Sequence, residues 1–103
     1  MKLLTAQIVK KLEKTPIYST EGVELQEKKV ICKFFNPIGS GTWYVFEGNK
    51  IENGDWEFFG VVDLLDKEMG YFLLSDLQKI ELPFGLKIER DISVFNKNYS
   101  DFM

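Results

Sequence analysis

Three acidic residues lie in the most aromatic part of the chain and are its weak candidates for catalysis: Glu47, Asp63 and Glu68. If the fold brought them together, burial would raise their pKa values, and the group would suit acid–base catalysis or a divalent cation. Alternatively, they are solvated carboxylates at strand ends, or one of them pairs with Lys33 or Arg90. We favour this alternative, because strand-end carboxylates are usually exposed to solvent.

Five aromatic residues could form a stacking surface for the bases of a single-stranded nucleic acid. They are Trp43, Tyr44, Trp56, Phe58 and Tyr71. Such surfaces normally lie in basic grooves, whereas the neighbours here are acidic, among them Asp55 and Glu57. We therefore favour core packing for these residues, with a protein-binding patch as the second interpretation.

Cys32 is the only cysteine, and the chain contains no histidine. This composition excludes an intrachain disulfide and the usual zinc sites, and it leaves a cysteine nucleophile without a histidine base. We expect no metal site and no cofactor, and we expect Cys32 to be buried in a strand. The Gly39-Ser40-Gly41 run lacks the spacing of a phosphate-binding loop and precedes a strand, so it predicts a turn.

The chain is long enough for one domain over residues 1–103, and its 45% hydrophobic content is enough for a core. A net charge of −3 disfavours nucleic acid or an anionic membrane as the main partner, and it is too small for a DNA mimic. With no secretory leader and no apolar run of about 18 residues, the expected location is the cytoplasm.

Hydrophobic periodicity predicts the elements that position these residues. Thr5 is a suitable cap for an amphipathic helix that ends before Pro16. Residues 17–28 are polar and mixed, and they fit either a loop or a short edge strand. The remaining pattern predicts a helix over 5–14, strands over 29–35, 42–47, 56–63 and 68–74, a helix over 75–82, an edge strand over 87–94 and a polar tail over 96–103.

Short connections between the strands predict an antiparallel meander, so the expected fold is a small α+β domain of four to five strands and two helices. In simple alternation, Trp43, Val45 and Glu47 share one face of their strand, and Tyr44 and Phe46 share the other. Two short helices can cover only one face of the sheet. The second face must then be covered by flanking segments, by a partner or by a second copy of the chain.

Two glycines lie inside predicted strands, Gly60 and Gly70. A strand glycine marks a β-bulge, a space for a neighbouring side chain or, less often, a ligand contact. We favour an aromatic ring stacked over each of them.

The sequence from Trp43 to Leu77 resembles an uncharacterised bacterial and phage family, domain-of-unknown-function family 2958. The resemblance rests on an aromatic pair in a strand ending in glutamate, an aromatic-glycine strand, a glutamate-x-glycine-tyrosine-phenylalanine segment and a capped helix. Here these are Trp43, Tyr44 and Glu47; Phe59 and Gly60; Glu68, Gly70, Tyr71 and Phe72; and Ser75 to Leu77. The resemblance implies an accessory role on plasmids, phages and other mobile elements, and it implies no activity.

From these observations we expect a non-catalytic binding protein that uses an aromatic sheet face, or the acidic loop 48–55, on another protein or on a second copy of itself. A small carboxylate-based or metal-dependent hydrolase is the alternative. A single-strand nucleic-acid binder is third, because the charge disfavours it.

Overall fold

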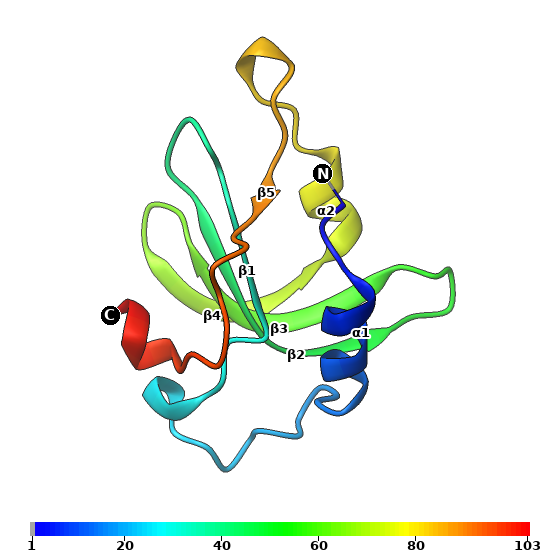
Figure 1. The fold of residues 1–103 in the computed structure, drawn as a ribbon, viewed down its shortest axis with the longest axis vertical. Helices are drawn as coiled ribbons and strands as arrows, with labels where there is room; N and C mark the ends of the chain where they lie inside the picture. The colour runs from blue at the N-terminus through cyan, green and yellow to red at the C-terminus, as the bar shows by residue number, and fades with distance from the viewer. Residues whose placement is uncertain (1) are drawn as a thin grey trace.

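A computed structural model describes residues 2–103 and contains one antiparallel sheet with helices around it (Figure 1). The order of the strands across the sheet is β4-β3-β2-β1-β5, which is the expected meander with a last strand added beside β1. The fold is therefore α+β. The bounds are α1 Ala6–Glu13, β1 Cys32–Phe35, β2 Thr42–Lys50, β3 Trp56–Asp63, β4 Lys67–Leu73, α2 Leu74–Lys79 and β5 Glu89–Arg90, with short 3-10 helices η1 Leu25–Glu27, η2 Pro83–Gly85 and η3 Tyr99–Phe102.

Several element boundaries differ from those expected. The strand expected over 42–47 continues to Lys50, because its last three residues pair with the start of β3. The polar loop is correspondingly shorter than 48–55. The edge strand expected over 87–94 shrinks to two residues, and the strand expected over 29–35 begins only at Cys32.

One face of the sheet, here called the helix face, packs against α1 and α2. Thr5 caps α1 as expected, accepting a hydrogen bond from the backbone N of Ile8 at 3.2 Å. Leu12 of α1 and Leu77 of α2 are buried against the sheet. The buried residues of this cluster are Leu3, Leu4, Leu12, Cys32, Phe34, Trp43, Val45, Trp56, Phe58, Phe72, Leu77 and Ile88.

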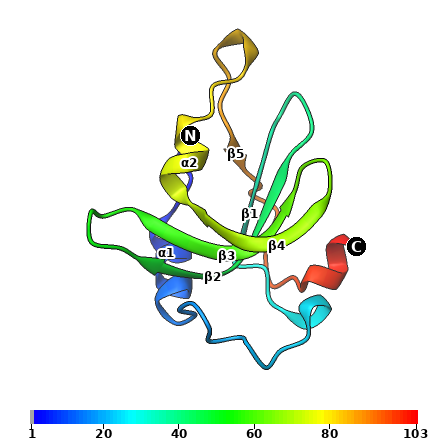
Figure 2. The same cartoon turned by 180° about the vertical axis from the view of Figure 1, so that it is seen from behind.

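The opposite face, here called the loop face, is partly covered by the chain itself. Figures 1 and 2 show η1 and η3 side by side, on the other side of the molecule from α1 and α2. Tyr99 of η3 is buried and packs edge-on against Tyr44, with ring centroids 5.2 Å apart. The tail expected over 96–103 is therefore docked. The buried residues of this second cluster are Val30, Tyr44, Phe46, Val61 and Tyr99.

A β-bulge in β2 overturns the expected alternation of its side chains. Val45 pairs with Gly60 and Glu47 pairs with Phe59, so two steps along β2 match one step along β3. The extra residue, Phe46, lies in the loop-face cluster. As a result Glu47 does not share a face with Trp43 as expected, but points to the loop face.

The bulge also explains Gly60. A Cβ atom placed there would lie 1.7 Å from the carbonyl oxygen of Tyr44, so the backbones approach too closely for any side chain. The expected aromatic ring over this glycine is wrong. Around Gly70, a Cβ atom would meet no atom within 4 Å, so no ring occupies that space either.

Candidate functional site

One row of paired residues crosses three strands of the loop face. Glu47 of β2 pairs with Phe59 of β3, and Phe59 pairs with Tyr71 of β4. Directly paired residues in an antiparallel sheet carry their side chains on the same face. The rings of Phe59 and Tyr71 accordingly lie with centroids 5.1 Å apart. This row places a carboxylate next to two aromatic rings.

The carboxylate of Glu47 holds the segment that follows α1. Its Oε1 accepts a hydrogen bond from the backbone N of Tyr18 at 2.8 Å. Its Oε2 accepts one from the backbone N of Thr20 at 3.0 Å, and another from the hydroxyl of Thr20. The backbone N of Ile17 adds a bond of 3.1 Å to Oδ1 of Asn49. We call residues 15–20 the anchored segment. Figures 1 and 2 show it as part of the connection that leads from α1 to η1.

A buried lysine completes this network. Nζ of Lys28 donates to the carbonyl oxygen of Thr20 at 2.5 Å and to its hydroxyl oxygen at 2.8 Å. Lys28 and Glu47 are both nearly inaccessible to solvent, with exposures of 5% and 2%. Thr20 thus links a buried cation to a buried anion, which is the condition under which buried charges are tolerated.

The anchored segment and η1 border an open cleft of about 440 Å³ on the loop face, here called the cleft. Its apolar walls include the exposed side chains of Tyr18, Val23, Met69 and Tyr71, of which Tyr18 is 67% and Tyr71 51% exposed. The lining residues are Tyr18, Glu21, Gly22, Val23, Glu24, Leu25, Lys28, Glu47, Phe59, Met69 and Tyr71. The cleft therefore joins the sequence segment 18–28 to strands β2, β3 and β4.

The two tyrosines of the cleft are linked, and one is strained. A hydrogen bond with the side chain of Tyr18 is the main cause of a raised pKa at Tyr71, and loss of hydration adds to it. Tyr71 therefore keeps its proton at neutral pH and offers a hydroxyl and a ring, not a phenolate. Tyr18 has φ 78°, a left-handed conformation that is unfavourable for a bulky residue and persists only where surrounding bonds enforce it.

The free charges around the cleft are negative. Glu21 and Glu24 line it and are exposed, while Lys28, the lysine in its lining, is buried and engaged with Thr20. A partner with positive charge would complement this border.

The three acidic candidates do not form a group. Glu47 is buried and its carboxylate already accepts hydrogen bonds from three donors. Asp63 pairs with Lys67 at the end of β3, four residue pairs away from the Glu47 row. Glu68 is exposed and pairs with Val62 on the helix face. Among the described residues, no group of three or more acidic or cysteine side chains is arranged to hold a metal ion.

Four of the five aromatic candidates lie in the core. Trp43, Trp56 and Phe58 are buried on the helix face, and Tyr44 is buried on the loop face. Only Tyr71 of the five is exposed. A common stacking surface is therefore not formed, and core packing is the correct interpretation for those four residues.

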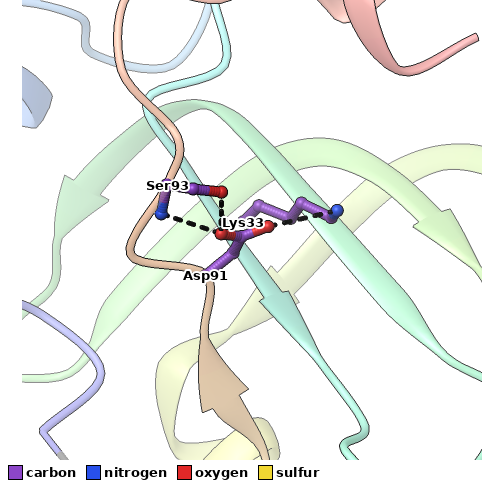
Figure 3. Close-up of polar contacts among 3 residues, drawn as sticks. All are labelled: Lys33, Asp91 and Ser93. Atoms are coloured by element: carbon purple, nitrogen blue, oxygen red, sulfur yellow. Dashed lines mark hydrogen bonds and ion pairs between the residues drawn. The ribbon is translucent and has the colours of Figure 1, made fainter.

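A second polar cluster joins β1 to the chain after β5 (Figure 3). Nζ of Lys33 lies 3.4 Å from Oδ2 of Asp91, whose Oδ1 accepts bonds from the backbone N and hydroxyl of Ser93 at 2.8 and 2.6 Å. The Ser93 hydroxyl is the main reason that the pKa of Asp91 is lowered. Lys33 also lies 5.0 Å above the ring of Phe102, so this cluster fixes η3 to the sheet. The partner of Lys33 is thus Asp91 and none of the three acidic candidates.

Cys32 is buried as expected, and burial raises the pKa of its thiol, which makes it unreactive. Residues 36–41 form the expected turn, closed by a 2.9 Å hydrogen bond from the N of Asn36 to the O of Gly41. Neither feature contributes to the cleft.

Of the residues that line the cleft, the sequence had singled out only Glu47 and Tyr71 as candidates. Tyr18, Val23 and Lys28 lie in the segment that no periodicity described, as does Thr20, which bonds to Glu47 and Lys28 beside the cleft. The position of Glu47 depends on a β-bulge that the alternating pattern concealed. The available signal was a glutamate within an aromatic strand, which is an unusual residue to bury.

Within residues 2–103, no helix has the length and hydrophobicity needed to cross a membrane.

Comparison with known families gives one result. The family described as protein of unknown function (DUF2958) matches residues 3–100 of the 103. No match is found among curated proteins or among solved structures.

Proposed function

The chain belongs to the DUF2958 family of proteins of unknown function, and from that premise we propose that it is a non-catalytic protein-binding module that holds its partner in the cleft. The observation that carries this proposal is a group of exposed apolar side chains, Tyr18, Val23, Met69 and Tyr71, gathered around one concave surface. Exposed apolar groups of this kind mark interaction sites when polar residues surround them. An accessory role on mobile elements and a cytoplasmic location belong to the same proposal.

The rigidity of the cleft supports binding. Three hydrogen bonds to Glu47 fix the anchored segment on the sheet, and they hold Tyr18 in its left-handed conformation. A wall that is already ordered loses little conformational entropy when a partner binds. Strain of this kind is typical of binding and active sites.

The side chains in the cleft favour binding over catalysis. Glu47 is engaged by the backbone and hydroxyl of the anchored segment, and Tyr71 keeps its proton. Tyrosine is enriched at the centres of protein interfaces, where its ring is buried and its hydroxyl finds a partner. The hydrolase alternative would need a free base, and the nucleic-acid alternative would need basic residues at this border.

Site-specific photo-crosslinking in bacterial cells tests this function. Benzoylphenylalanine placed at Tyr71 or Met69 is expected to capture the same defined protein. At Phe84, which is 94% exposed in η2, and at Phe95, it is expected to capture none. These two phenylalanines are exposed and are not among the residues that line the cleft, so they control for random collision.

The captured protein is then purified and its affinity is measured by calorimetry. We expect Tyr71→Ala to weaken binding at least tenfold and Phe84→Ala to leave it unchanged. Equal capture from all four positions, or an affinity insensitive to Tyr71→Ala, contradicts the proposed function. A specific turnover abolished by Glu47→Gln would support the hydrolase instead.

A further inference from the structure

We propose that the partner presents an extended segment, apolar at alternate residues and basic at its ends, which adds to the free edge of β4 as a sixth strand. This inference rests on the proposed function and specifies the partner and the binding mode. β4 lies at one edge of the sheet, with β3 on its inner side, so its outer backbone groups face away from the sheet. Such an edge is a template for an added strand.

The edge of β4 carries few features that block strand addition. Its sequence is KEMGYFL, which has no proline, and its charges are confined to Lys67 and Glu68 at the start. Proteins usually protect free edges with charges, proline or a covering loop. Gly70 stands at the centre of the strand, and no atom lies within 4 Å of its missing Cβ position. Residues 69–73 therefore contain no charged residue and no proline, which are usual protections of a free edge, and Gly70 places no bulky side chain at the centre of β4.

The cleft lies where alternate side chains of an added strand would point. Rows of paired residues cross the loop face from β2 to β4: one ends at Tyr71, and the next ends at Met69. In an added strand, every second side chain continues these rows, because directly paired residues share a face. Apolar side chains at these positions would contact Tyr71 and Met69, both about half exposed.

The charge at the border of the cleft favours basic residues at the ends of the bound segment. Glu21 and Glu24 are exposed at the border of the cleft, and Lys28 is occupied by Thr20. Lysine or arginine flanking the apolar residues would complement these carboxylates, whereas an acidic segment would be repelled.

Strand addition at the opposite edge of the sheet, and pairing with a second copy of the chain, are both less favourable. The opposite edge, β5, has only two residues, and its Arg90 donates to the backbone O of Lys2. A second copy pairing β4 with β4 around Gly70 would set Lys67 opposite Leu73, a charge against an apolar residue. A separate partner segment can carry basic residues that complement Glu21 and Glu24.

A synthetic probe tests strand addition on the full chain. The probe is acetyl-Lys-Thr-Val-Thr-Val-Thr-Val-Thr-Lys-amide, which carries valine and the terminal lysines on one face when extended. We expect it to bind with a Kd below about 1 mM by calorimetry or NMR titration. In an extended strand, amides of alternate residues point to opposite sides. Methylating the three valine amides, or the four threonine amides, therefore blocks opposite edges of the peptide.

Strand addition predicts an asymmetric result. One methylated peptide should lose at least about tenfold in affinity, because it cannot donate hydrogen bonds to β4, and the other should bind within about threefold of the parent. Amide hydrogen exchange should also slow in residues 67–73 on binding. Equal affinities of the two methylated peptides, or no binding of the parent below 1 mM, would overturn the inference.

A charge exchange tests the flanking residues. The double variant Glu21→Lys/Glu24→Lys should bind the lysine probe at least about fivefold more weakly in low salt, and should gain affinity for the same peptide with glutamate ends. The control Glu13→Lys/Glu52→Lys changes the net charge equally at exposed positions outside the cleft, and should stay within twofold of wild type. Equal effects of the two double variants would contradict a basic segment.

Different results would exclude strand addition at β4 and protein binding in the cleft. If the probe binds, depends on Tyr71 and shows no methylation asymmetry, the cleft binds a segment without strand addition. That result overturns this inference and leaves the proposed function intact. If Tyr71→Ala binds the probe as well as wild type, the cleft is not the binding site and this inference fails. Absence of capture from positions 69 and 71 in cells would instead overturn the proposed function.

Discussion

Glu47 contributes a buried negative charge to a face that is otherwise built from aromatic rings. Its desolvation is offset by two backbone N–H groups and one hydroxyl, all from Tyr18 and Thr20. The nearby cation of Lys28 reaches the same threonine. The side chain therefore anchors the wall of the cleft. Its removal should lower the free energy of unfolding of the protein.

The variant Glu47→Gln keeps the shape of the side chain and replaces one acceptor oxygen with an NH₂ donor. It should lower the free energy of unfolding by about 1 to 3 kcal/mol, because buried donors of the anchored segment lose a charged acceptor. Urea denaturation measures this change. The control Glu68→Gln alters an exposed carboxylate on β4 and should stay within about 0.5 kcal/mol of wild type. Equal stability of the two variants would mean that Glu47 does not anchor the segment.

At the scale of elements, the β-bulge decides which face receives Glu47. Phe46 is the inserted residue, and the two strands approach so closely beside it that Gly60 cannot carry a side chain. A bulge of this kind redirects the side chains that follow it. Without it, Glu47 would point toward the helices, and the anchored segment would have no acceptor on the loop face.

Gly60 and Gly70 pair with each other across β3 and β4, and they give a matched test of the close approach between β2 and β3. Gly60→Ala should destabilise the protein by at least about 2 kcal/mol, because its Cβ atom would overlap the carbonyl oxygen of Tyr44. Gly70→Ala introduces the same methyl group at the position paired with Gly60, where space is open, and should change stability by no more than about 0.5 kcal/mol. Thermal unfolding of both variants measures the difference. A mild effect at Gly60 would contradict the close approach of β2 and β3.

The β2–β3 hairpin is tied to α2 by a second carboxylate. Asp55 accepts hydrogen bonds from the hydroxyl of Ser75 at 2.5 Å and from its backbone N at 3.1 Å. The Ser75 hydroxyl is the main reason that the pKa of Asp55 lies below its ordinary value of 3.8. A lowered pKa in the folded state stabilises the fold above the ordinary pKa, and this contribution is lost as the pH falls toward the folded-state value.

Asp55→Asn should therefore destabilise the protein most at pH 6 and progressively less between roughly pH 5 and pH 3. Urea denaturation of wild type and variant at a series of pH values measures the difference. Ser75→Ala should reduce the same pH dependence, because it removes the largest cause of the shift. The exposed neighbour Glu52→Gln serves as control. A difference between wild type and Asp55→Asn that does not change with pH would contradict this role.

At the scale of the whole molecule, the chain covers much of its own second face. The sequence predicted the α+β meander, because hydrophobic alternation and short connections determine strand pairing locally. It left open whether flanking segments, a partner or a second copy covers the loop face, since Tyr99 and Phe102 come from a polar tail that docks through Lys33 and Tyr44. The cleft was hidden for the same reason: it joins residues 18–28 to β2–β4 through a bulge and long-range hydrogen bonds.

Because Tyr99 of η3 packs on Tyr44 and Phe46, self-association is not needed to bury these two loop-face rings. We expect the protein to sediment as a monomer across about a hundredfold range of concentration, where mass action would expose a weak dimer. Sedimentation equilibrium measures this. A dimer that dissociates in Tyr71→Ala would show that the cleft binds a second copy and contradict a separate partner.

The central claim, that the cleft is a protein-binding surface, is tested most directly by selecting a random peptide library against wild type and Tyr71→Ala in parallel. We predict a consensus of alternating apolar residues with basic flanks on wild type, absent from Tyr71→Ala and retained on Phe84→Ala. The same consensus on all three proteins, or no enrichment on wild type, would contradict the claim.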